Sequence, residues 1–141
     1  MEKLSKDFFG NEVLICGCSD KDNLYYKRLN KAFLSNGITV YPMPTTPESE
    51  LGFKTYKSYT DLPIIPKCAY VLSYKSKTPE IIDELSRLGV NKIAFYGNAC
   101  VDDEILHKCD SLGIETRLGC PMMLFASGFC WIHAKIAGVK R

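Results

Sequence analysis

The amino-acid sequence predicts an α/β fold in which helices flank a doubly wound, parallel sheet of five strands. Three observations carry this prediction. Short apolar runs alternate with stretches of helical period, these runs suit parallel strands covered on both faces, and three helical stretches end at a glycine that precedes a strand. With right-handed crossovers, the expected strand order is 3-2-1-4-5.

The five expected strands are short apolar runs. They are residues 13–16, 38–41, 69–73, 92–96 and 114–118. Strand and helix alternate along the chain except between the second and third strands, where residues 42–67 hold five of the seven prolines. We expect that stretch to be mostly ordered loop with a short helical turn.

The three expected helices end at Gly37, Gly89 and Gly113, because glycine tolerates the left-handed conformation that closes a helix. Each helix carries an apolar face at helical spacing. The faces comprise Tyr25, Leu29, Ala32 and Phe33; Ile81, Ile82, Leu85 and Leu88; and Ile105, Leu106, Cys109 and Leu112. The expected start signals are Asp20 or Asp22; a Thr78 cap followed by Pro79 and Glu80; and Asp102, Asp103 and Glu104.

Size and charge narrow the class of protein. The 141 residues fit one domain, 1–141, and the formal net charge of +2 gives no global field for binding nucleic acid. No apolar run reaches the roughly 18 residues of a membrane span, and the first seven residues lack the apolar core of a secretion signal. Seven cysteines, an odd number at irregular spacing, indicate free thiols in a reduced cytoplasmic protein.

The candidate site follows from the predicted sheet. In an open α/β sheet the ligand binds outside the carboxyl ends of the strands, where the strand order reverses. In the expected order this is the loop after the first strand, Gly17, Cys18, Ser19 and Asp20, faced by Tyr96, Gly97 and Asn98 after the fourth. Glycine permits a tight turn, and the following helix presents free N–H groups to an anion. The loop is thus either a cradle for phosphate or diphosphate, or a plain βα turn.

The sequence lacks the features of a dinucleotide site. Gly17 is followed by no second or third glycine of a G-x-G-x-x-G fingerprint, and no carboxylate stands at the end of the second strand to bind a ribose. An NAD dehydrogenase is therefore disfavoured. The uncharged stretch at Pro42 and Met43 suits packing against an adenine ring, and Lys75 and Lys77 supply charge for phosphates unless they are ordinary surface lysines.

Four motifs stand in a fixed order along the chain: Gly17–Cys18–Ser19, and residues 40–44, 51–56 and 119–122. In this order they resemble the stand-alone CoA-binding proteins, small Rossmann-like proteins similar to the nucleotide-binding domain of the succinyl-CoA synthetase α subunit. The resemblance implies that the protein binds coenzyme A or a related adenine nucleotide.

This sequence also departs from the family pattern at three places. Pro44 replaces an asparagine, Tyr96 stands where the family has an amide, and Tyr74–Lys75 replaces Phe-Arg. The scaffold for adenine and phosphate therefore carries over better than the identity of the ligand. The expected ligand-binding residues are Gly17, Cys18, Ser19, Pro42, Met43, Tyr74, Lys75, Gly97 and Cys120.

Cysteines gather near the carboxyl ends of the expected strands: Cys16, Cys18, Cys100 and Cys120. Three interpretations stay open, in which Cys120 or Cys18 forms a mixed disulfide with the CoA thiol, the thiolates bind a metal, or the cysteines are structural. We favour structural cysteines, and predict no metal and no catalytic residue. The alternative to a binding module is a small acyl-CoA-handling or thiol-redox enzyme that uses Cys120.

The final stretch, residues 122–137, is largely apolar and includes Trp131. It is predicted to be either a last helix packed on the sheet or the interface of a homodimer. His107 is expected on a solvated helix face, and His133 as a packing residue. The predicted partners are thus a small nucleotide ligand and a second copy of the chain, with no nucleic acid and no membrane.

Overall fold

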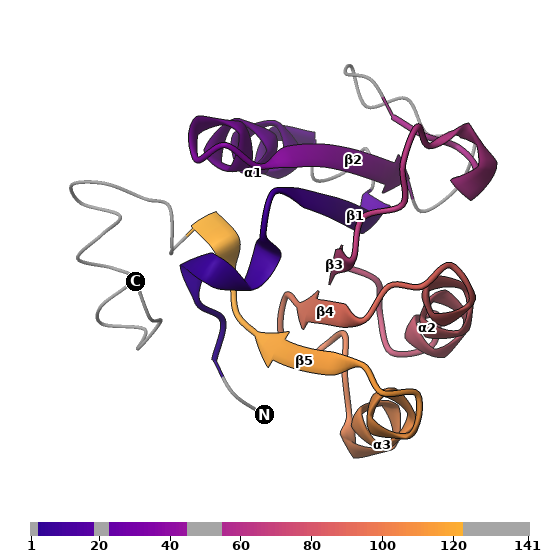
Figure 1. The fold of residues 1–141 in the computed structure, drawn as a ribbon. Coiled ribbons are helices and arrows are strands. Elements are labelled where there is room, and N and C mark those ends of the chain that lie inside the picture. Colours follow the sequence, from indigo (N-terminus) through magenta and orange to yellow (C-terminus); the bar gives the residue numbers. More distant parts are fainter. Residues whose placement is uncertain (1–2, 19–22, 45–54, 123–141) are drawn as a thin grey trace.

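The computed structural model describes residues 3–18, 23–44 and 55–122 and contains one parallel, five-stranded sheet (Figure 1). The strands are β1 (Glu12–Cys18), β2 (Thr39–Pro44), β3 (Cys68–Val71), β4 (Lys92–Phe95) and β5 (Glu115–Leu118). All four neighbouring pairs are parallel. The predicted α/β class is therefore confirmed, with strand boundaries within three residues of the expected ones.

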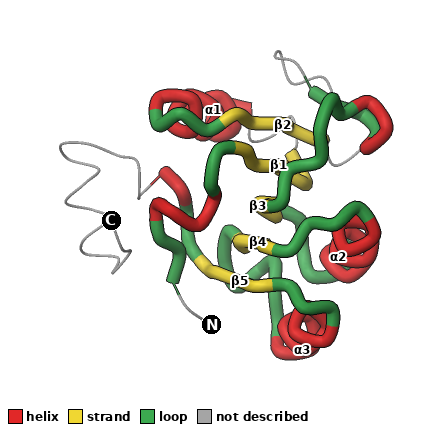
Figure 2. Tube along the Cα trace, viewed as in Figure 1, coloured by secondary structure: helices red, strands yellow, loops and turns green. Residues whose placement is uncertain are grey.

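Helices cover both faces of the sheet. Helix α1 (Asn23–Ser35) lies on one face together with the 3-10 helix η1 (Lys6–Phe9), whereas α2 (Thr78–Arg87) and α3 (Asp103–Ser111) lie on the other (Figures 1 and 2). The connection from β2 to β3 includes a 3-10 helix, η3 (Tyr59–Asp61). This is the short helical turn that we expected within the proline-rich stretch. The fold is thus doubly wound, as the sequence predicts.

The predicted strand order was wrong. The observed order is β2-β1-β3-β4-β5, so β1 lies between β2 and β3, and β2 forms an edge of the sheet. Pro42 and Pro44 lie in β2, and neither has an N–H group to donate to a neighbouring strand. A strand with two prolines is tolerated at an edge, where only one side needs hydrogen bonds, better than between two strands. The two prolines in β2 are compatible with its position at the edge.

All three helices end in the same motif. Gly37, Gly89 and Gly113 have φ angles of 75°, 90° and 73°, as predicted for left-handed closing residues. After each glycine, the next N–H group donates to the carbonyl five residues earlier over 2.9–3.0 Å, which is a Schellman motif. The pairs are Ile38 to Phe33, Val90 to Leu85, and Ile114 to Cys109. Each motif turns the chain directly from a helix into the next strand.

The helix starts agree with the sequence in one case and differ in another. Asp102 caps α3, because its Oδ1 accepts a hydrogen bond from the Ile105 N–H group over 2.9 Å. Thr78 was predicted to cap α2 but lies inside the helix, and its hydroxyl makes no cap hydrogen bond. The signals at Asp20 and Asp22 lie outside the described residues.

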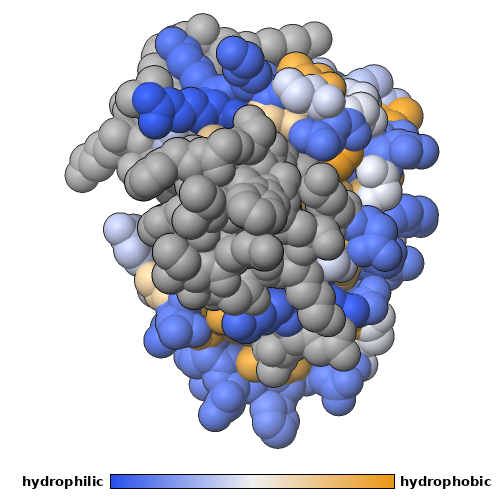
Figure 3. All heavy atoms as spheres, turned by 90° about the vertical axis from the view of Figure 1, so that its left-hand side faces the viewer, coloured by the Kyte–Doolittle hydropathy of each residue, from blue (hydrophilic) through white to orange (hydrophobic). Residues whose placement is uncertain are grey.

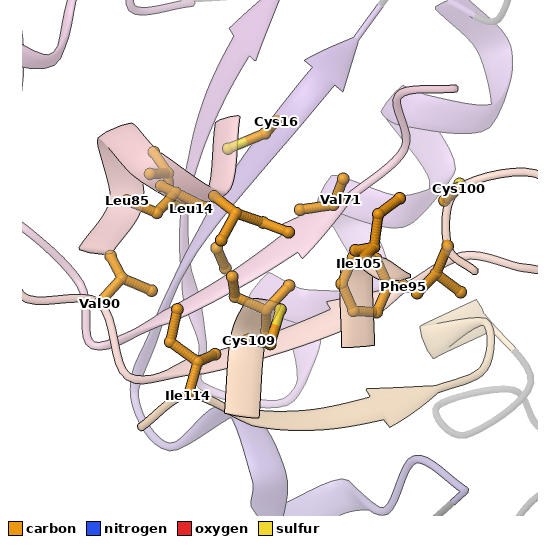
Figure 4. Close-up of a cluster of buried hydrophobic side chains, with 14 of the residues drawn as sticks. Leu14, Cys16, Val71, Leu85, Val90, Phe95, Cys100, Ile105, Cys109 and Ile114 are labelled. Atoms are coloured by element: carbon orange, nitrogen blue, oxygen red, sulfur yellow. The ribbon is translucent and has the colours of Figure 1, made fainter. Parts of the chain in front are cut away.

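Two clusters of buried side chains fill the two faces, and we name them by their helices. The α1 cluster includes Phe9, Phe33 and Tyr70, and the α2–α3 cluster includes Leu85 and Phe95 (Figure 4). Among the helices that the structure describes, none is long and apolar enough to cross a membrane. Residues 123–141, which hold most of the apolar final stretch, lie outside the described residues, as does His133.

Candidate functional site

The strand order places the switch point between β1 and β3. Chain connections run outward in opposite directions from this pair, because α1 leads to β2 on one side and α2 leads to β4 on the other (Figure 1). Ligands of open α/β sheets bind outside the carboxyl ends of the strands at such a point. The residues that face Gly17 are therefore those after β3. Gly97, which was expected to face Gly17, follows β4, one strand further away.

Gly17 lies close to the chain that leaves β3. A Cβ atom on Gly17 would stand 2.4 Å from the Oγ atom and 2.9 Å from the main-chain nitrogen of Ser73. The φ angle of Gly17 is 94°, a conformation that disfavours any other residue. Both the space and the backbone therefore require glycine, which gives a physical reason for the first predicted motif.

The first turns of α1 hold the switch point in place through two tyrosines. The hydroxyl of Tyr26 donates to the carbonyl oxygen of Gly17 over 3.1 Å. The hydroxyl of Tyr25 lies 3.1 Å from the Sγ atom of Cys120 and 3.3 Å from the hydroxyl of Tyr70, and its ring contacts Tyr96 edge to face. Burial raises the pKa values of Tyr25 and Tyr70, so both phenols are neutral hydrogen-bonding groups.

The loops that follow β3 and β4 are joined by two hydrogen bonds. The hydroxyl of Thr78, which is fully buried, is 2.8 Å from the carbonyl oxygen of Cys100, and the main-chain N–H group of Lys75 donates to Ala99 over 3.0 Å. The Thr78 hydroxyl also lies 3.1 and 3.3 Å from the carbonyl oxygens of Tyr74 and Ser73. The region beside Gly17 is therefore tied to the next loop along the edge.

The predicted ligand residues after β3 lie at the surface. The Tyr74 side chain is 76% exposed, and Lys75 and Lys77 are also exposed. Their side chains border the switch point without a hydrogen bond or ion pair to other described residues. Tyr96, at the end of β4, is 48% exposed. The structure thus brings aromatic and cationic side chains to the same edge as Gly17.

The predicted adenine residues are placed differently. Pro42 and Met43 pair with Ile15 and Cys16 of β1, and both side chains are buried. The main chain of Cys18 ends β1 beside Pro44, after a register shift that follows Cys16. Ser19 lies outside the described residues. Of the predicted set, Gly17 and Cys18 lie at the switch point, with Tyr74 and Lys75 across from them.

Most of the described thiols are core residues. Cys16, Cys68, Cys100 and Cys109 are buried, and burial raises the pKa of Cys16 and Cys68 to about 12 and that of Cys109 to about 11. A thiol with such a pKa is protonated and unreactive near neutral pH. Cys120 is half-buried instead. Within the described ranges, no group of three His, Cys, Asp or Glu residues could hold a metal ion. His107 is exposed, as expected.

Sequence reasoning missed Ser73, Tyr25, Tyr70 and the linking role of Thr78. Ser73 stands at the end of the apolar run 69–73 and was counted as a strand residue. One signal was available, because a hydroxyl side chain at the carboxyl end of a buried strand is placed as ligand residues of this fold commonly are. Tyr25 was assigned only to an apolar helix face.

The parallel sheet, its strand order and the glycine at the switch point define a Rossmann-like α/β protein with a candidate ligand site at the carboxyl ends of β1 and β3. The family model of the CoA binding domain matches residues 11–126, and the chain therefore belongs to the CoA binding domain family. The resemblance that the four motifs indicated is confirmed. No curated protein matches the chain.

Solved structures share the fold. A protein redesigned for binding has a TM-score of 0.67 at 21% identity, covering 86% of this chain and 87% of that protein. A conserved hypothetical protein from Pyrococcus furiosus has a TM-score of 0.60 at 22% identity, covering 85% and 95% of the two chains. A hypothetical protein from Pyrococcus horikoshii has a TM-score of 0.61 at 22% identity, covering 81% and 80%. At these identities the similarity concerns the fold alone.

Proposed function

We propose that this protein binds coenzyme A, or a related adenine nucleotide, at the carboxyl edge of β1 and β3 without turning it over. The observation that carries the proposal is the match of the CoA binding domain over residues 11–126. The geometry supports it, because Gly17 and Ser73 meet at the carboxyl ends of β1 and β3, the place where such folds bind ligands. A protein with free, unpaired cysteines suits the reducing cytoplasm.

Each proposed residue has one role. Main-chain N–H groups of Gly17, Cys18 and Ser19 hold the diphosphate, and the ammonium group of Lys75 pairs with a phosphate. Tyr74 and Gly97 border the ligand on the side of β3 and β4. Pro42 and Met43 form the apolar floor under the adenine at the end of β2, and Cys120 lies near the pantetheine thiol.

Calorimetric titration with CoA tests the proposal, with Gly17→Ala and Gly113→Ala as a matched pair. Both glycines have positive φ, so both variants lose about 1 kcal/mol of stability from backbone strain, and Gly17→Ala loses more because its Cβ would clash with Ser73. Only the Cβ at position 17 enters the candidate site, since a Cβ at position 113 meets nothing within 4 Å. We expect CoA affinity to fall about tenfold or more in Gly17→Ala and to stay unchanged in Gly113→Ala. Flat titrations of the unaltered protein with CoA, acetyl-CoA and ATP would contradict the proposal.

A second candidate function uses Cys120 in acyl-CoA handling or thiol-redox chemistry. It is favoured by one observation, that the Cys120 thiol is half-buried beside the Tyr25 hydroxyl whereas the other described free thiols are buried. Mass spectrometry of protein purified without reductant measures any CoA adduct. Under this function Cys120→Ser removes the adduct, and an unchanged adduct yield and CoA affinity in that variant reject it.

The proposed homodimer through residues 122–137 is tested separately by sedimentation velocity. A chain that stays monomeric at high concentration rejects it, because an apolar interface would bring two copies together.

A further inference from the structure

Ser73 is a buried polar residue with unused hydrogen-bond donors. Its residue exposure is 8%, and among the described residues its hydroxyl has no hydrogen-bond partner. Its main-chain N–H group likewise has none there, although its carbonyl oxygen accepts from Thr78. Buried polar groups in folded proteins are nearly always satisfied, and an exception often marks a place where a ligand or water completes the bonding.

The two unused donors lie at the switch point. Both the Oγ atom and the nitrogen of Ser73 approach the Cα of Gly17 so closely that a Cβ there would stand 2.4 and 2.9 Å from them. The hydroxyl and the N–H group of Ser73 are therefore two neighbouring donors beside a residue that has no side chain. Neighbouring donors of this kind suit the oxygens of an anion.

The position of Ser73 is fixed by its neighbours. The Thr78 hydroxyl, fully buried in the first turn of α2, lies 3.3 Å from the Ser73 carbonyl oxygen, and the N–H group of Leu72 donates to Cys16 of β1 over 2.9 Å. Tyr26 binds the carbonyl of Gly17 from the other side. The carbonyls of Cys16 and Gly17 are therefore satisfied within the protein, whereas the donors of Ser73 are left over.

We propose that Ser73 is a ligand-binding residue whose hydroxyl and main-chain N–H group donate to oxygens of the ligand's diphosphate beside Gly17. This inference rests on the proposed function and adds a residue that follows β3 to the site, beside Gly17 of β1. It assigns the ligand chemistry at this residue to a phosphate anion rather than to a base or a ribose. Under this inference the affinity for CoA depends on its diphosphate as well as on its adenine.

Ser73→Ala tests the inference, because it removes the hydroxyl without adding volume. We expect affinity for CoA to fall about tenfold, as expected for a hydrogen bond to a charged group, and affinity for adenosine, which has no phosphate, to stay unchanged. The ligand-free variant should melt at the same temperature as the unaltered protein or higher, because the hydroxyl is buried without a partner. A merely structural serine would lower the melting temperature instead.

Ser111→Ala is the matched control. The Ser111 hydroxyl is exposed and donates to the carbonyl of Lys108 over 2.7 Å, at the other end of the sheet from Gly17. Its removal should leave CoA affinity unchanged and lower the melting temperature slightly.

Inorganic diphosphate separates this inference from the proposed function. If the unaltered protein binds CoA and Ser73→Ala binds it equally well, the role of Ser73 is rejected while the proposed function stands. If the protein binds diphosphate but not CoA, and Ser73→Ala weakens diphosphate binding, the proposed function fails and the anion site stands. Binding of neither compound rejects both.

Discussion

On the α1 face of the sheet, aromatic side chains pack edge to face among aliphatic ones, whereas the α2–α3 cluster is mostly aliphatic, with cysteines and Phe95. The Phe9 ring lies 4.9 Å from Phe33 and 6.4 Å from Tyr70, measured between ring centroids. The opposite cluster comprises residues such as Leu85, Ile105 and Cys109 (Figure 4). The same strands supply both faces, because successive strand residues point to opposite sides.

The difference concerns which face supports the site. On the α1 face, tyrosine hydroxyls extend from the core to the switch point, through Tyr70, Tyr25 and Tyr26 to Cys120 and Gly17. On the α2–α3 face, the buried hydroxyl of Thr78 serves the loops above the core. The α1 face therefore combines stability with positioning of the site, whereas most of the α2–α3 face contributes stability alone.

The outer surfaces differ as well. Helix α1 exposes Lys27, Arg28 and Lys31 and has no acidic residue in its first turn. Figure 3 views the molecule from the left-hand side of Figure 1, and hydrophilic residues lie at its upper left, along its right edge and at its bottom. Helix α3 instead opens with Asp103 and Glu104. The basic residues of α1 form a solvated helix face and are not part of the candidate site, which lies at the carboxyl edge of the sheet.

The largest effect is expected from the aliphatic face. Leu85→Ala should lower the free energy of unfolding by about 3 kcal/mol, because it removes a fully buried side chain and leaves a cavity. Urea denaturation measures the loss. CoA affinity of the folded variant should not change. The matched control is Leu112→Ala, because Leu112 is 42% exposed and should cost less than about 1 kcal/mol. An equal cost at both positions would argue against a tightly packed α2–α3 cluster.

The next effect is a loss of stability at high pH. Burial raises the pKa of Cys16 to about 12 from an ordinary value of 9.0. As the pH rises, the Cys16 thiol therefore loses its proton in the unfolded chain before it does so in the folded protein. The contribution of the neutral thiol to stability is complete below pH 9 and is lost as the pH rises from 9 toward 12. Between pH 8 and 11, the free energy of unfolding should fall by about 2–3 kcal/mol more in the unaltered protein than in Cys16→Ala.

A buried thiol of the α1 cluster allows the same test at high pH on the other face of the sheet. Cys68 lies in the α1 cluster and has the same raised pKa of about 12, so Cys68→Ala should reduce the pH dependence by a similar amount. Urea titrations at several pH values measure both variants. An identical pH dependence in all three proteins would show that these thiols do not stay protonated in the core.

The smallest effect is expected from a single hydroxyl on the aromatic face. Tyr70→Phe keeps the buried ring and removes one hydrogen bond to Tyr25, which retains its contact with Cys120. The free energy of unfolding should fall by about 1 kcal/mol in urea denaturation. Tyr74→Phe, at an exposed position, should leave stability unchanged. A cost at Tyr70 as large as that at Leu85 would show that the tyrosine network, rather than packing, dominates the α1 face.

The local parts of the fold could be predicted from the sequence. Glycine at positions 37, 89 and 113 ends each helix through hydrogen bonds that span only five residues, and Asp102 caps α3 through a contact three residues away. Thr78 misled the prediction because its hydroxyl bonds to Cys100, in a different loop. A capping pattern describes only neighbouring residues, so it could not predict a bond to Cys100, which lies 22 residues away.

The sequence by itself determined the α/β class, the helix ends and the glycine near the end of β1, because these depend on residue type and short-range spacing. Only the tertiary structure decided that β1 lies between β2 and β3, and hence that Ser73 rather than Gly97 stands beside Gly17. Strand order depends on which side of β1 the chain packs after a long connection. That choice is made by burial and by hydrogen bonding between segments far apart in the chain, which periodicity along one segment does not encode.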